Sequence, residues 1–430
     1  MSADTLNIVI SKKDLDAVVS RAGLAAMTEE GQSKMAKTSN ETRGCVRIAA
    51  VAGKITFESS VSRFSVLHAV RTGEGEGEAS ILSEGETCVP AKELKIVAGK
   101  IKDGRKVSIV FRPMPPDPTL NASSADMAVL PDGVVEIGVI SGSKVVSKTK
   151  IEAYPSSRFA APQYPEDSSL TVIMAGKASI LKQPCGVVGF SVNVQDLKEV
   201  YDKFAFFTSQ EGIFFLGSDG RRASVVQVNG SVFDQFLSQE TDVPILVDAE
   251  FLSPIMASLS DDDALSVKMD EDQERAYFCS GNTTYCVNMV DKALRKKYPN
   301  YRRIVGVKTK AVVLVNRDEL SETISLLGIV NNDRSRYTFC KDEQVIKVLG
   351  RGIGTVKEST GSIGFQIVGE ELPKTETISL NTKYLIEGLK NMKCDNIRMS
   401  FSEDELRVKI EDETNPAFIY FMQVMNPNEA

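Results

Sequence analysis

The sequence has no tryptophan and a single histidine, His68, in 430 residues. Ser-His-Asp triads, cysteine–histidine dyads with a second histidine, and multi-histidine metal sites all need imidazole groups that this chain does not have. Seven cysteines are scattered and never form a CxxC pair, which argues against a disulfide framework and a zinc site. We therefore expect no enzyme activity, no metal and no cofactor, and an ordinary strand position for His68.

Long apolar runs are also missing. No stretch approaches the ~20 apolar residues that span a bilayer, and MSADTLNIVISKKDL has charge where a signal peptide needs an apolar core. The Gly-rich segments GEGEGE and LGRGIGT do not end in GK[ST], so hairpin or loop turns are a better interpretation than phosphate loops. We expect a cytoplasmic protein without membrane contact.

One strand-then-helix pattern occurs six times along the chain. Apolar residues alternate seven and five positions before a leucine, as a strand requires, and recur four and seven positions after it, as on one helix face. Polar stretches between the two supply helix N-caps. The six leucines are Leu15, Leu94, Leu197, Leu252, Leu320 and Leu385.

Short strands follow each predicted helix, so the units pair into three similar α+β domains, with helices covering one face of antiparallel sheets. We place the domains at 1–165, 166–304 and 305–430. Chance strand-helix steps in any α+β protein are the alternative explanation, but the same offsets recur in all six places.

Basic residues collect on five of the six predicted helices, opposite the apolar face, although the net charge is -7. This arrangement suits sequence-neutral contact with a nucleic-acid backbone, because no Arg or Asn cluster for base readout is present. The fourth helix, DAEFLSPIMASL, has no basic residue, and each lysine could simply be solubilising. The predicted nucleic-acid contacts are Lys12, Lys13, Arg21, Lys92, Lys95, Lys102, Lys198, Lys203, Arg317, Lys383, Lys390 and Lys393.

The C-terminal segment TISLNTKYLIEGLKNMKCDNIRMSFSEDELRVKIEDETNPAFIYFMQV resembles the last part of the beta subunit of bacterial DNA polymerase III, the bacterial sliding clamp family. YPNYRRI, from Tyr298 to Ile304, is similar to the family's segment between domains two and three. SDGRRA, from Ser218 to Ala223, is similar to its second-domain TDGHRLA motif, and ETCVPAKELKIVAGKI is a weaker likeness.

The resemblance implies the DNA clamp fold, with three domains per chain and a homodimeric ring that encircles double-stranded DNA. Six units per chain give the family's twelve helices around a two-fold ring. The implied partners are the clamp loader and the replicative and repair DNA polymerases, bound through short linear motifs. A β-rich interaction scaffold without DNA stays open as an alternative, since it shares the repeats but does not need a basic helix face.

In the family, a pocket between domains two and three takes these peptides, an apolar cleft edged by a few polar groups. The resemblance assigns the pocket to Ser218, Gly220, Arg221, Arg222, Ala223, Pro299, Arg303, Ile304, Asn381, Tyr384, Tyr420 and Met422. Arg221 replaces the family's histidine, Ala223 the following leucine, and Gln423 the proline of its terminal motif. We therefore expect a larger pocket with a shifted peptide preference.

The family's dimer contact joins domain one of one chain to domain three of the other. Ile329 and Val330 match its domain-three side, and Val145 and Val146 lie near the matching strand of domain one. Either pair could equally belong to a core.

Overall fold

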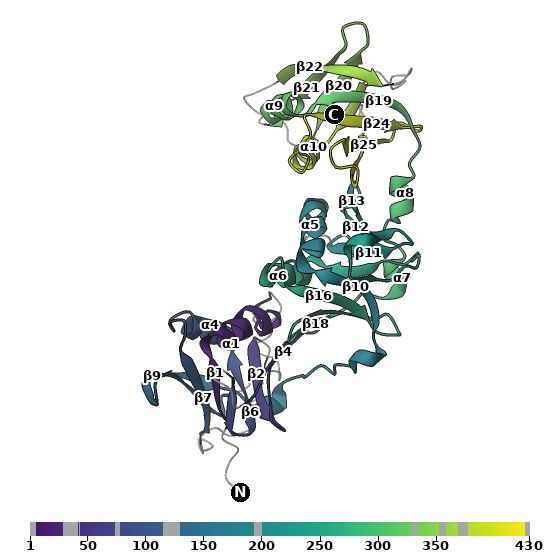
Figure 1. Ribbon diagram of the computed structural model, residues 1–430. Coiled ribbons are helices and arrows are strands. Elements are labelled where there is room, and N and C mark those ends of the chain that lie inside the picture. The colour runs from purple at the N-terminus through teal and green to yellow at the C-terminus, as the bar shows by residue number, and fades with distance from the viewer. Residues whose placement is uncertain are drawn as a thin grey trace, which may run out of the picture. The chain divides into compact units, whose positions relative to one another are not determined.

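The computed structural model describes residues 6–28, 42, 44–73, 78–114, 130–192, 200–328, 334–351, 358–368 and 377–425 (Figure 1). The chain divides into two compact units. Unit 1 comprises Met1–Ser179 with Glu250–Met289, and unit 2 comprises Ile180–Ala249 with Val290–Ala430. Residues of the predicted second domain therefore belong to both units.

The N-terminal domain lies in unit 1 and consists of two successive strand-helix-strands halves. The first half contains β1 (Asn7–Ser11), α1 (Lys12–Ala17), its π-helical continuation η1 (Val18–Ala22), β2 (Cys45–Val51), β3 (Lys54–Ser60) and β4 (Phe64–Val70). The second contains β5 (Ser80–Ser83), β6 (Gly85–Pro90), α4 (Ala91–Ala98), β7 (Lys106–Pro113), β8 (Gly133–Ser141) and β9 (Lys144–Ala153).

Local chemistry starts the first helix where the sequence predicts it. The Ser11 hydroxyl accepts a hydrogen bond from the Asp14 amide at 3.0 Å, and the Asp14 carboxylate accepts one from the Ser11 amide at 3.3 Å. This capping box satisfies two amides that the helix itself leaves unpaired.

Unit 1 is completed by second-domain elements: β10 (Thr171–Lys177), most of α6 (Ala249–Ser258), β16 (Ala264–Met269), β17 (Arg275–Ser280) and β18 (Thr283–Asn288). One sheet has the order β5-β1-β7-β8-β9. A second antiparallel sheet runs β10-β16-β17-β18-β4-β3-β2-β6. Pairing of β18 with β4, from Thr283 opposite His68 to Val287 opposite Phe64, joins the first domain to the second.

Unit 2 holds the remaining second-domain elements and the third domain. From the second domain come most of α5 (Ala178–Val188), β11 (Lys203–Thr208), β12 (Gly212–Ser218), β13 (Arg222–Asn229) and β15 (Ile245–Asp248). The connection and third domain contain α7 (Lys292–Arg295), α8 (Tyr301–Val305), β19 (Thr309–Asn316), α9 (Arg317–Gly328), β20 (Ser335–Cys340), β21 (Val345–Arg351), β22 (Glu358–Val368), β23 (Thr377–Leu380), α10 (Thr382–Leu389), β24 (Asn396–Ser402), β25 (Arg407–Asp412) and β26 (Phe418–Gln423).

These strands form one twelve-stranded sheet of order β15-β11-β12-β13-β26-β25-β24-β19-β22-β21-β20-β23. Antiparallel pairing of β13 with β26 joins the second domain to the third. Among the described residues, no helix is long and apolar enough to cross a membrane.

Five of the six predicted helix leucines lie buried in helices, as the repeat requires: Leu15, Leu94, Leu252, Leu320 and Leu385. The third prediction is wrong in register. The strand and helix of that unit are β10 and α5, with Leu181 buried, while Lys203 and Phe204 lie in β11; Leu197 falls outside the described residues. Pro184 inside α5 disfavours a helix on sequence grounds, but burial of Leu181 and Val188 stabilises it.

The two domain joins obey one rule. The last strand of a domain's first half pairs with the last strand of the next domain's second half: β4 with β18, and β13 with β26. Two strands of these classes remain, β22 from the first half of domain three and β9 from the second half of domain one.

Candidate partner-binding cleft

A cleft of about 260 Å³ opens in unit 2 where β13 begins and β26 ends. Most residues of the predicted peptide pocket line it: Ser218, Gly220, Arg221, Arg222, Ala223, Pro299, Arg303, Ile304 and Met422. The remaining lining residues were not predicted: Tyr201, Val307, Arg407, Phe421 and Gln423.

The turn from Ser218 to Arg222 forms one edge of the cleft. The Asp219 carboxylate accepts hydrogen bonds from the Arg221 and Arg222 amides, both at 2.9 Å, and the Ser218 hydroxyl donates to the Arg222 carbonyl at 2.8 Å. Gly220 has φ +85°, and a Cβ there would lie 3.1 Å from the Tyr201 ring. Both the backbone angle and the close approach of Tyr201 therefore require glycine.

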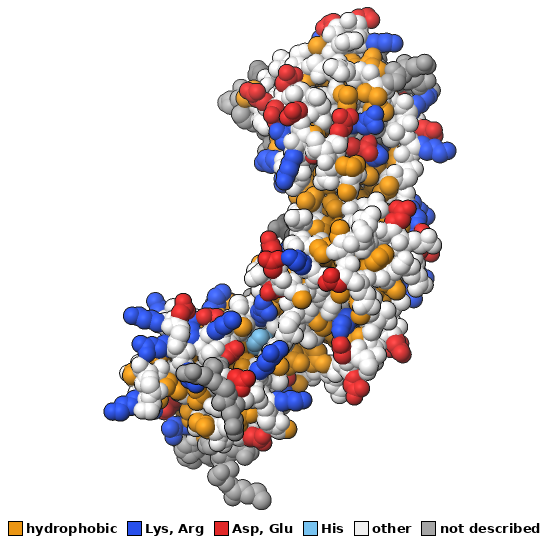
Figure 2. All heavy atoms as spheres, in the orientation of Figure 1, with side chains coloured by type: hydrophobic (Ala, Val, Ile, Leu, Met, Phe, Trp, Pro, Cys, Tyr) orange, Lys and Arg blue, Asp and Glu red, His pale blue; other side chains and the backbone are white. Residues whose placement is uncertain are grey.

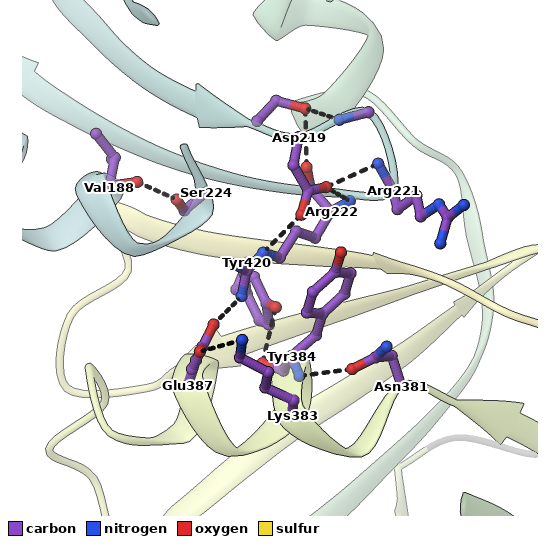
Figure 3. Close-up of polar contacts among 12 residues, drawn as sticks. Val188, Asp219, Arg221, Arg222, Ser224, Asn381, Lys383, Tyr384, Glu387 and Tyr420 are labelled. Atoms are coloured by element: carbon purple, nitrogen blue, oxygen red, sulfur yellow. Dashed lines mark hydrogen bonds and ion pairs between the residues drawn. The ribbon is translucent and has the colours of Figure 1, made fainter. Parts of the chain in front are cut away.

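Arg222 lies at the centre of a polar cluster behind this edge (Figure 3). Its Nε donates to Asp219 at 3.0 Å, its Nη1 contacts the Glu387 carboxylate, and its guanidinium stacks 4.1 Å from the Tyr384 ring centroid. Burial opposes the charge, but Tyr420, Glu387 and Asp219 raise the pKa of the Arg222 guanidinium above its usual value. Arg222 is therefore a permanent cation that ties β13 to α10.

Three predicted pocket residues support the cleft without lining it. The Asn381 side chain caps α10 by accepting from the Tyr384 amide at 2.9 Å. The Tyr420 hydroxyl donates to the Tyr384 carbonyl at 2.9 Å, and burial raises the pKa of this phenol, so it stays protonated (Figure 3). These contacts position Tyr384 over Arg222.

Two tyrosines hold the segment on the opposite side of the cleft. Tyr298 is buried, with its hydroxyl 3.3 Å from the Lys203 carbonyl, and Tyr301 stacks on Phe214 with ring centroids 4.0 Å apart. Because both rings point into the second-domain sheet, Pro299 and Ile304 face the cleft.

The cleft combines an apolar surface with positive charge. Ala223, Ile304, Val307 and Met422 supply the apolar part, and no Asp or Glu is among the lining residues. Its basic residues are Arg221, Arg222, Arg303 and Arg407. This arrangement fits an aliphatic or aromatic side chain next to a carboxylate.

Register explains two of the residues that the sequence did not predict. Arg407 pairs with Gln423 across β25 and β26, and the Gln423 amide donates to the Arg221 carbonyl at 2.9 Å. Gln423 replaces the proline of the family motif, which would have been a signal for its place in the pocket. Arg407 gives no local signal, because only the strand pairing brings it there.

Most of the predicted nucleic-acid contacts are exposed on or near helices. The exposed residues are Lys13, Lys92, Lys95, Lys102, Lys383, Lys390 and Lys393. Lys and Arg side chains gather around the N-terminal domain, where α1 and α4 lie (Figure 2).

Two other predicted contacts are held by partners within the chain. Arg21 binds Asp263 at 2.8 Å, and Arg317 donates to the Met392 carbonyl at 2.7 Å. Lys198 lies outside the described residues.

For Lys12 and Lys203 the expectation of an exposed helix face is wrong. Lys12 is 6% exposed and contacts Asp16, and Lys203 is 1% exposed, in β11, with Asp202 at 2.7 Å and Asp248 at 2.9 Å. Buried ammonium groups need such carboxylate partners, so local ion pairs decide the position of both lysines.

The predicted dimer residues of domain one lie on β9. Val145 is 44% exposed and Val146 61% exposed, so neither belongs to a core. Ile329 and Val330 fall outside the described residues. In the described part of the chain, all cysteines are free thiols and no group of three His, Cys, Asp or Glu side chains could hold a metal ion.

Comparisons with known proteins agree with this construction. Residues 302–426 match the family model described as DNA polymerase III beta subunit, C-terminal domain. The chain is 22% identical to the beta sliding clamp of Escherichia coli K12 over 301 residues, 69% of this chain and 77% of that protein. It is also 22% identical to the beta sliding clamp of Synechocystis over 342 residues, 76% of this chain and 78% of that one.

Solved structures show the same fold over almost the whole chain. A beta sliding clamp from Caulobacter crescentus has a TM-score of 0.73 at 13% identity, covering 98% of this chain and 99% of its own. A DNA polymerase III beta subunit from Thermotoga maritima has a TM-score of 0.73 at 14% identity, with the same coverage. The fold is thus the DNA clamp fold, and the chain belongs to the beta sliding clamp family of DNA polymerase III beta subunits.

Proposed function

We propose that this chain works as a DNA sliding clamp, closing as a homodimer around double-stranded DNA and tethering the clamp loader and DNA polymerases through the unit 2 cleft. Encirclement holds the protein on DNA, and the exposed helix lysines make loose contacts with phosphates. The chain performs no catalysis of its own and acts in the cytoplasm.

The observation that carries the ring is the rule of the two domain joins. First-half and second-half end strands pair at β4 with β18 and at β13 with β26. The same rule applied once more pairs β22 of one copy with β9 of a second copy. Two such contacts related by a two-fold axis close a ring.

Both strands have an edge suited to this pairing. β9 is an outer strand of its sheet, with exposed Val145 and Val146 near its start. The first part of β22 pairs with β21, and β19 meets it only from Phe365 onward. An exposed strand edge favours pairing with another chain, and two apolar side chains add burial to that pairing.

The cleft supports the tethering part of the proposal. Its apolar surface and arginine edge favour short peptides with an aliphatic or aromatic anchor and an acidic neighbour. Replacement of the family's histidine by Arg221 strengthens the preference for acid at this position.

Retention on DNA tests the function. After loading, the protein should remain on circular DNA and leave linear DNA through its ends. A Val145→Asp/Val146→Asp variant should have the native mass of a monomer and should remain on neither form. Equal loss of the wild-type protein from circular and linear DNA would contradict encirclement, and a wild-type monomer would contradict the dimeric ring.

A further inference from the structure

A second cleft, of about 380 Å³, lies in unit 1 where β4 begins and β18 ends. Its residues come from the turn before β4, the end of the β17–β18 hairpin and the segment after β9. They are Thr42, Ser60, Val61, Ser62, Arg63, Phe64, Ser65, Phe159, Ala160, Ala161, Pro162, Gln163, Arg275, Cys286 and Asn288.

The two clefts occupy equivalent positions in the repeat. In each, a turn leads into the last strand of a first half, which pairs with the last strand of the next domain's second half. Phe64 opposes Val287 in the first join, as Arg222 opposes Met422 in the second. An interdomain segment forms the remaining wall of each cleft: 159–163 in unit 1 and 299–307 in unit 2.

The equivalence extends to individual side chains. Phe64 stacks on Phe251 with ring centroids 5.0 Å apart, as Arg222 stacks on Tyr384. Phe251 and Tyr384 each precede the buried leucine of their helix by one position. Arg63 precedes Phe64 as Arg221 precedes Arg222, so both clefts have an arginine at the same edge.

The interdomain segment of unit 1 is fixed in place beside the cleft. Tyr164 donates from its hydroxyl to the Ser65 hydroxyl at 3.2 Å, next to Pro162 and Gln163 of the wall. The Asn288 side chain donates to the Ser62 carbonyl at 3.2 Å, which holds the turn against the end of β18. The cleft is thus a built feature of the join.

Lining chemistry restricts the occupant. Arg63 and Arg275 supply positive charge, Ser60, Ser62 and Ser65 supply hydroxyls, and no Asp or Glu lines the cleft. Phe159 and Pro162 add an apolar surface. An extended peptide with an apolar side chain beside a carboxylate satisfies both parts.

We propose that the unit 1 cleft is a second docking site for short acidic-apolar peptides, so that one chain binds two partner segments, one at each domain join. The inference rests on the proposed function in that the unit 2 cleft is taken as the peptide site whose construction is repeated. Two sites on one chain raise the effective concentration of a partner that carries two such segments.

The test uses the full chain and a fluorescent, C-terminally amidated peptide of sequence Gly-Leu-Asp-Phe-Gly, with Gly-Leu-Asn-Phe-Gly as the neutral control. Titration should give two bound peptides per chain for the wild type. Arg63→Glu/Arg275→Glu and Arg221→Glu/Arg303→Glu should each leave one site, and the four changes together should leave none. Loss of the carboxylate should weaken binding roughly tenfold at each site.

Hydrogen exchange on the wild-type protein provides a second readout that needs no variant. The peptide should slow amide exchange at 60–66 and 284–288 as well as at 218–224 and 420–423. One bound peptide, abolished by Arg221→Glu/Arg303→Glu alone, would overturn the second site and leave the proposed function intact. Binding that survives the changes in both clefts would overturn the assignment of the unit 2 cleft as well. A change in native mass with Arg63→Glu/Arg275→Glu would show that a second copy occupies the face instead.

Discussion

The two domain joins share one backbone construction but are held by different chemistry. In unit 1, Phe64 stacks on Phe251, and His68 lies opposite Thr283 in the same strand pair, with its Nδ1 2.8 Å from the Thr283 hydroxyl. In unit 2, the position of Phe64 is taken by Arg222, which binds Asp219 and Glu387 and stacks on Tyr384.

This difference shows which part of the join the repeat requires. Strand pairing is common to both, because backbone hydrogen bonds do not depend on side-chain identity. The side chain at the start of the strand is free to vary, provided that it covers the aromatic ring of the neighbouring helix. An apolar cover contributes burial, whereas a charged cover also needs carboxylate partners.

Removing the aromatic cover of unit 1 should have the largest effect. Phe64 is fully buried, so Phe64→Ala should lower the free energy of unfolding by about 4 kcal/mol through lost burial and the resulting cavity. Denaturant titration measures the loss, and hydrogen exchange should show faster opening of β4 and β18. Phe64→Leu is the matched control and should cost less than about 2 kcal/mol; an equal cost for both would show that the ring stacking matters little.

Removing the charged cover of unit 2 should cost about 3 kcal/mol, because Arg222→Met leaves the buried Asp219 and the half-buried Glu387 without their cation. Opening should be fastest at β13 and β26 in hydrogen exchange. Adding Asp219→Asn to Arg222→Met should recover part of the stability, since one unpaired charge is then removed. No recovery would mean that Arg222 acts by packing on Tyr384 rather than by ion pairing.

Acid should distinguish the two joins by about 2 kcal/mol between pH 7 and pH 4.5. Burial, with a contribution from Arg21, lowers the pKa of His68 from 6.5 to about 4, while Asp14 opposes the shift. Between these values the unfolded chain binds more protons than the folded one, so stability is lost as pH falls. Unfolding of wild type and His68→Gln across this range measures the effect, and equal acid sensitivity of the two proteins would exclude His68 as its source.

The arginine at the cleft edge should set the peptide preference by about 1 kcal/mol. Arg221→His restores the family residue and removes a permanent charge, so the acidic peptide should lose affinity relative to its neutral control at the unit 2 cleft. The same ratio at the unit 1 cleft, where Arg63 is unchanged, is the internal reference. An unchanged ratio in unit 2 would place acid recognition on Arg303 or Arg407.

The smallest effect concerns DNA. Reversing the exposed helix lysines Lys13, Lys95 and Lys390 to Glu should weaken binding and reduce the dependence of log K on log salt by roughly 0.9 for each lost phosphate contact. Reversal of Lys54 and Lys341, which are exposed outside helices, is the control. Equal effects of the two sets in a filter-binding or fluorescence titration would make the helix lysines ordinary surface residues.

Local patterns of the sequence predicted much of the fold and of the cleft. Five of the six repeat leucines lie where the periodicity places them, because the spacing of apolar residues on a helix or strand is a property of the local backbone. The turn at Gly220 and the capped starts of α1 and α10 are local in the same sense.

Tertiary contacts decided the rest. Burial keeps α5 helical around Pro184, and carboxylate partners bury Lys12 and Lys203, although their sequence positions favour exposure. Strand register alone brings Arg407 to the cleft and makes the two joins equivalent. The sequence by itself determined the repeated units, since periodicity needs only neighbouring residues. Which charges are buried, and which strands meet at a cleft, depend on residues far apart in the chain and were decided by the tertiary structure.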